Sequence, residues 1–108
     1  MKTFKQIIYR ESDTALMIIP TNDEQVNPLF VNDLSKSEQA TFEDLKQFCL
    51  TKVTSLAYGV YFTEEKRFDI QPVEGDVILV YIDQLETSDK NIFDKVGSVC
   101  SQLLNANA

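Results

Sequence analysis

The sequence predicts an α+β fold: a mostly antiparallel β-sheet of five to six strands with two amphipathic helices, in the order β-β-(β)-α-β-β-β-α. Short runs in which apolar and polar residues alternate are typical of strands, and two longer segments repeat apolar residues at helical spacing. Only a few turn-forming residues separate neighbouring strand candidates. Because such short connections suit hairpins, we expect antiparallel pairing.

Length and composition indicate one domain. The chain has 108 residues, of which 44% are hydrophobic and 25% charged, as in ordinary globular proteins. We expect a single α+β domain over residues 1–104 and a frayed C-terminal tail over residues 105–108. We identify no internal repeat, linker or low-complexity segment.

The first elements are predicted to form a hairpin. Residues 3–10 alternate as a strand does, residues 12–14 supply turn chemistry, and residues 15–19 are apolar on both faces. A strand of this second kind is usually covered on both sides, and Pro20 ends it. Residues 29–31 fit a short edge strand or a loop plug equally well.

The next element is an amphipathic helix over about residues 37–50, with Ser35 and Ser37 competing as its N-cap. Its apolar positions recur at helical spacing: Phe42, Leu45, Phe48 and Cys49. The strand predicted at residues 54–63 then alternates large and small side chains. We expect the large ones (Leu56, Tyr58, Val60, Phe62) to face the core, and the small ones (Ser55, Ala57, Gly59) to allow a close approach.

Two further strands are predicted after a charged hairpin tip at residues 64–66. Residues 67–71 read as a half-exposed strand, and residues 72–76 form a turn. Residues 77–82 are six consecutive apolar residues rich in β-branched side chains, so we expect them to form the central strand of the sheet.

The last predicted helix begins at Ser88, as a serine cap, with Asp89 in its first turn. Gly97 lies within this helix, where glycine costs about 1 kcal/mol relative to alanine. We therefore expect Gly97 to serve close packing, either against Ala57 and Gly59 in the same chain or between subunits.

The composition argues against an enzyme. The chain has no histidine, the usual general base at neutral pH, and its two cysteines lie in apolar helical patterns, which favours free, buried thiols. No spacing matches a metal site or a glycine-rich phosphate loop. We expect no enzymatic activity, no catalytic residues, no metal and no cofactor.

Charge and hydropathy bear on partners and location. A pI near 4.4 opposes direct binding to nucleic acid or to an anionic membrane. The first twelve residues lack the apolar stretch of a signal peptide, and no window approaches the roughly 18 apolar residues of a membrane span. We expect a cytoplasmic protein.

Our leading hypothesis is a non-enzymatic protein-interaction domain that binds another protein or a second copy of itself. Residues 64–108 hold most of the net charge of −7. In the strong version, this acidic surface mimics nucleic acid and inhibits a basic partner protein. The candidate partner-binding residues are Glu64, Glu65, Asp69, Glu74, Asp76, Asp83, Glu86 and Asp89.

Two alternatives stay open. A structural or assembly subunit would form a homo-oligomer through an apolar sheet face left uncovered by the helices. The candidate residues for that face are Tyr9, Met17, Ile19, Tyr61, Val80 and Ile82. A small-molecule-binding domain would instead line a pocket with Tyr58, Tyr61 and Phe62, although alternation places Tyr61 opposite Tyr58.

Overall fold

The computed structural model describes residues 1–106, which form one antiparallel sheet and two α-helices. The elements are β1 (Phe4–Arg10), β2 (Ala15–Pro20), β3 (Leu29–Phe30), α1 (Lys36–Leu50), β4 (Leu56–Phe62), β5 (Arg67–Pro72), β6 (Ile78–Tyr81) and α2 (Thr87–Asn105), with single 3-10 turns η1 (Val31–Asp33) and η2 (Ile82–Gln84). The strand order is β3-β2-β1-β4-β5-β6. The predicted fold class and element order are confirmed.

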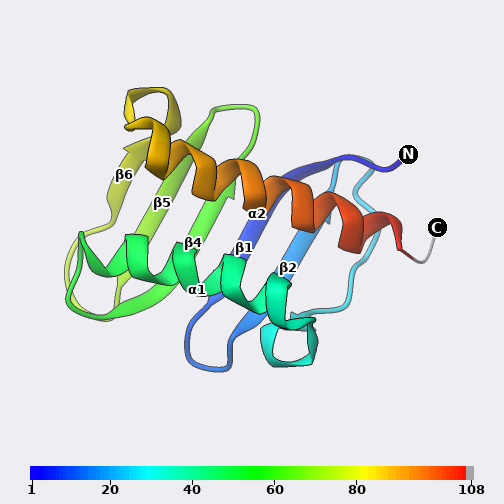
Figure 1. The fold of residues 1–108 in the computed structure, drawn as a ribbon, viewed down its shortest axis with the longest axis horizontal. Coiled ribbons are helices and arrows are strands. Elements are labelled where there is room, and N and C mark those ends of the chain that lie inside the picture. Colours follow the sequence, from blue (N-terminus) through cyan, green and yellow to red (C-terminus); the bar gives the residue numbers. More distant parts are fainter. Residues whose placement is uncertain (107–108) are drawn as a thin grey trace.

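Both helices lie on the same face of the sheet, where they run side by side across the strands (Figure 1). The core fills the space between the two layers. Phe93 of α2 stands at its centre, with ring centroids 5.4 Å from Phe48, 5.6 Å from Tyr61 and 5.1 Å from Phe68, all edge-on. We call the opposite, uncovered side of the sheet the open face.

The chain contains an internal repeat that we did not find in the sequence. The order β1-β2-β3-η1-α1 recurs as β4-β5-β6-η2-α2. The first strands of the two units both have seven residues and the second strands both have six. Each first strand also has a register shift at its start, between Phe4 and Gln6 in β1 and between Leu56 and Tyr58 in β4.

Backbone details repeat as well. The residue before the second strand has positive φ in both units, 51° at Thr14 and 48° at Lys66. β1 and β4 pair antiparallel with each other. The hydrogen bond from Glu11 N–H to Ala57 O (3.0 Å) is matched by one from Thr63 N–H to Lys5 O (3.2 Å). The two units are therefore related by an approximate two-fold axis between β1 and β4, perpendicular to the sheet.

The repeated side chains belong mainly to the side of the sheet that faces the helices, and to the helices themselves. Equivalent positions hold the same residue in seven cases: Tyr9 and Tyr61, Ile18 and Ile70, Pro20 and Pro72, Leu34 and Leu85, Ser37 and Ser88, Phe42 and Phe93, Cys49 and Cys100. Most of these residues are buried. The two units therefore share several residues of the packing between sheet and helices.

Two strand predictions are wrong in position. β6, expected at the centre, is an edge strand, paired only with β5 among the strands that the structure describes. β4 turns Tyr58, Val60 and Phe62 away from the helices: Tyr58 is exposed, whereas Gly59 is buried on the helix side and Tyr61 packs there against Phe93. Leu56 is buried as expected, because the register shift after it changes the alternation.

The helix ends differ from each other. Ser35 caps α1 in a capping box, accepting from Glu38 N–H (3.2 Å) while its own N–H donates to Glu38 Oε1 (2.9 Å). The serine cap predicted for the last helix is wrong, since α2 begins at Thr87 with Glu86 at the N-cap and no side-chain cap.

The C-terminal end of α2 is held against the start of the chain. Asn105, expected to begin the frayed tail, is the last residue of α2. Its Oδ1 accepts from Lys2 N–H (2.8 Å) and its Nδ2 donates to Lys2 O (3.0 Å). Residues 107–108 of the predicted tail lie outside the described residues.

The glycines correct one packing prediction. A Cβ on Gly59 would lie 2.5 Å from Cζ of Phe68, so Gly59 makes room for the ring from the neighbouring strand. A Cβ on Gly97 would meet nothing within 4 Å among the described residues. Within the chain, Gly97 therefore provides no close contact, and the predicted packing against Ala57 and Gly59 is wrong.

This contrast predicts opposite effects of the same substitution. Gly59→Ala should destabilise the protein by about 1–3 kcal/mol, because the Phe68 ring is 1% exposed and has little room to move. Gly97→Ala should stabilise it by up to about 1 kcal/mol through helix propensity. Urea unfolding of the two variants measures both effects, and equal shifts in one direction would contradict the packing described for Gly59.

Candidate interaction surface

The two thiols lie in the core. Cys49 and Cys100 are free and buried. Burial raises the pKa of each thiol to about 12, so both are neutral at pH 7 and poor nucleophiles. Among residues 1–106, no group of three or more Cys, Asp or Glu side chains could hold a metal ion.

The eight predicted acidic residues do not gather on one surface. Glu64 and Glu65 lie in the β4–β5 hairpin, next to Asp83 of η2, whose carboxylate is 3.9 Å from Lys66 Nζ. Glu74 and Asp76 lie in the β5–β6 turn, at the opposite end of β5. The remaining three are Asp69 in β5, Glu86 at the N-cap of α2, and Asp89 in its first turn.

The open face is instead apolar and aromatic. Strand register and alternation place on it the aromatic residues Phe30, Tyr58, Phe62 and Tyr81, the aliphatic residues Ile8, Met17, Ile19, Val60 and Leu79, and the polar residues Gln6, Arg10, Arg67, Asp69 and Gln71. Four of them are exposed large hydrophobic residues, between 41% and 48% accessible: Phe30, Tyr58, Leu79 and Tyr81.

Only part of the predicted apolar face is correct. Met17 and Ile19 lie on the open face, half-buried. Tyr9, Val80 and Ile82 are buried on the helix side, and Tyr61 packs there against Phe93. The residues proposed for a small-molecule pocket separate in the same way, because Tyr58 and Phe62 point to the open face and Tyr61 to the core.

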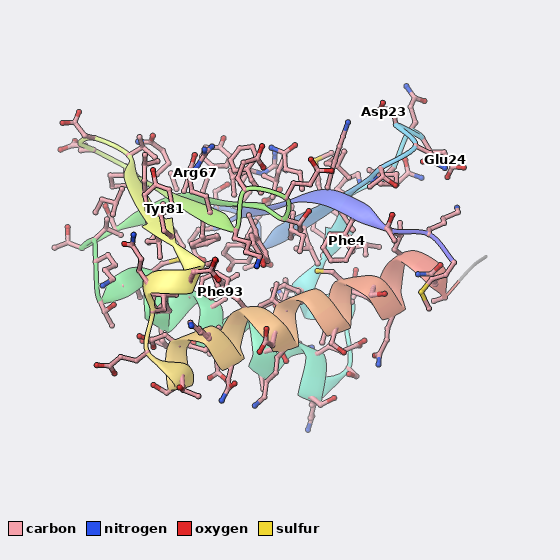
Figure 2. All side chains as sticks on the ribbon, turned by 90° about the horizontal axis from the view of Figure 1, so that it is seen from above. Phe4, Asp23, Glu24, Arg67, Tyr81 and Phe93 are labelled. Atoms are coloured by element: carbon pink, nitrogen blue, oxygen red, sulfur yellow. The ribbon has the colours of Figure 1, made fainter. Side chains whose placement is uncertain are left out.

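The charges on the open face are already paired. Arg10 makes two hydrogen bonds to the carboxylate of Asp13, of 2.8 and 2.7 Å. Arg67 donates to Asp69 (2.8 Å) and lies over the ring of Phe62, 4.5 Å from its centroid. Figure 2 shows Arg67 on the side of the sheet away from the helices and Phe93 between the two layers.

A polar network on the helix side joins β1 to α1. The Tyr9 hydroxyl donates to Glu11 Oε2 (2.6 Å), and Lys46 Nζ lies 2.8 Å from Glu11 Oε1. Burial, and then the hydrogen bond to Glu11, raises the pKa of Tyr9. The network borders a surface hollow of about 420 Å³. Its polar groups bind one another, so we assign them a structural role.

The edge strand β6 is unprotected. Ile82 N–H donates to Lys66 O (2.9 Å), so by alternation the N–H and C=O groups of Leu79 point away from β5. A hollow of about 230 Å³ beside β6 is lined by Lys52, Gln84, Leu85 and the strand itself. Residues 77–82 carry neither charge nor proline, the usual protections of an edge.

Sequence reasoning missed most of the open face. The sequence-based hypotheses give Phe30, Leu79 and Tyr81 no role and place Tyr58 in the core or in a pocket, although the alternation of Tyr58, Val60 and Phe62 separates them from Gly59. What the sequence does not reveal is which side the helices cover.

The buried thiols predict low reactivity. At pH 8, neither Cys49 nor Cys100 should react with a thiol reagent in the folded protein, whereas both should react after unfolding in guanidinium. Labelling followed by mass spectrometry measures this. Labelling of the native protein at the rate of a free cysteine would contradict the burial.

The same burial predicts a pH dependence. Because the folded pKa is above the unfolded value, the stabilisation from each neutral thiol is full below about pH 8.5 and declines as pH rises toward the folded value. Between pH 7 and 9.5 the loss should be about 1 kcal/mol per thiol. Urea midpoints of the native protein and of the Cys49→Ala/Cys100→Ala variant measure it, and equal pH slopes would contradict the prediction.

Comparison with known proteins adds no relative. No family model matches the chain, and no curated protein or solved structure matches it. Within residues 1–106, neither helix has the length and apolar character needed to cross a membrane.

Proposed function

We propose that this chain is a non-enzymatic protein-interaction domain that binds through its open face. One observation carries the proposal: both helices cover the same side of the sheet, so the other side, six strands wide, is left to solvent. Soluble monomers seldom expose a continuous apolar surface larger than a few hundred Å², and larger ones usually mark an interaction site.

The residue types on this face support the proposal. The centres of protein interfaces are enriched in Tyr, Phe, Met and Arg and depleted in Lys and Glu. The open face has two tyrosines, two phenylalanines, one methionine and two arginines, while Lys5, Glu64 and Glu65 lie at its border, beside Gln6 and Phe62. Aromatic residues and arginine also supply most of the residues that dominate binding energy.

The acidic-inhibitor hypothesis receives less support. A nucleic-acid mimic needs closely spaced negative charges on one surface, whereas Glu64 and Glu74 lie at opposite ends of the sheet and Asp69 is paired with Arg67. We therefore give the acidic residues the role of discouraging contacts elsewhere on the molecule. We propose a cytoplasmic location, which free thiols at Cys49 and Cys100 favour.

Site-specific photo-crosslinking in the source cells tests the proposal. A benzophenone amino acid at Val60, on the open face, should give discrete protein adducts, and the same group at the exposed Gln102 of α2 should give none. Ile8→Glu should remove the Val60 adducts without unfolding the protein, because it places a charge beside Val60 on the same face. Adducts from Gln102 alone would overturn the proposal.

A further inference from the structure

We propose that the partner of the open face is a second copy of this chain, packed face to face about a two-fold axis. This inference rests on the proposed function. A two-fold contact uses the same patch on both subunits, so the patch must be able to face itself. The size, the charge and the arrangement of the open face all meet that requirement.

The size approaches that of a standard dimer interface. At about 4.8 Å between strands the sheet is roughly 24 Å wide, and its seven-residue central strands are roughly 23 Å long. Because β3 has only two residues and β6 only four, the projected area is about 500 Å², and protruding side chains such as Tyr58 and Tyr81 raise the accessible area above this value. A standard interface takes about 800 Å² from each partner.

The charge favours this face over any other for contact between copies. Each copy has a net charge of −7, so two copies repel each other across most of their surfaces. The open face carries two arginines and one aspartate, and is the exception. Because Arg10 forms an ion pair with Asp13 and Arg67 with Asp69, the arginines of this face need no negatively charged groups from a partner.

The arrangement places apolar side chains at the centre. Ile8 and Val60 are opposite each other across β1 and β4, next to the approximate two-fold axis of the chain. Met17 extends this row on β2 and Asp69, whose carboxylate is paired with Arg67, extends it on β5, while Arg10 and Arg67 lie in the rows above and below it. Two copies centred on Ile8 and Val60 would bury these side chains against their counterparts and leave the arginines nearer the rim, as in typical interfaces.

Analytical ultracentrifugation of the purified full chain tests the inference. The native protein should sediment as a dimer at tens of micromolar. Val60→Glu should weaken self-association by at least about 100-fold, because it buries two unpaired carboxylates near the axis. Gln102→Glu, which adds the same charge on α2, should leave the dimer unchanged. Circular dichroism confirms folding, and Met17→Lys provides a second variant on β2 should Val60→Glu fail to fold.

The other outcomes are distinguishable. If the native protein is monomeric but still gives Val60 crosslinks to a different protein, the partner is not a second copy, whereas the proposed function remains supported. A dimer that survives both Val60→Glu and Met17→Lys overturns the face-to-face contact. If such a dimer dissociates with Leu79→Pro but not with Leu79→Ala, the copies meet along the β6 edge, since only proline removes the outward N–H of residue 79.

Discussion

The antiparallel pairing of β1 with β4 is the constraint on which the other features depend. It joins two similar units about an axis perpendicular to the sheet. A rotation about such an axis returns each face of the sheet to itself. If α1 covers one face in the first unit, α2 must therefore cover the same face in the second, and the other face has no helix to cover it (Figure 1).

As a result, the two faces of the sheet differ in how similar the residues at equivalent positions of the two units are. On the helix side, most equivalent positions keep the same or similar residues, as with Ile18 and Ile70, because each packs against an equivalent helix; Ile7 and Gly59 are an exception. On the open face most equivalent positions differ, as Met17 of β2 and Asp69 of β5 do, although Ile8 and Val60 are similar. The shared core preserves the architecture, and the differences on the open face give the two halves separate surfaces.

The order of elements was predictable because it depends on local patterns, such as the capping box at Ser35 and the hairpin turn before β5. The strand order was not predictable. An apolar run like that of β6 is usual for a central strand, but β6 is an edge strand whose alternate side chains point toward the helices and toward the open face. The same ambiguity reversed β4, where Tyr58 and Val60 looked like core residues. The repeat was hidden because identity between the units is limited to scattered positions, most of them in the core, such as Phe42 and Phe93.

Because Lys2 and Asn105 are in contact, the fold does not depend on which of the two units comes first in the sequence. The ends of the described chain are joined by hydrogen bonds of 2.8 and 3.0 Å, so a short peptide linker could connect them. Opening the chain between α1 and β4 would then give a circularly permuted protein, in which the second unit precedes the first. The same sheet would form, with β1 and β4 still neighbours, because their pairing is a contact in space and requires no particular connection in sequence.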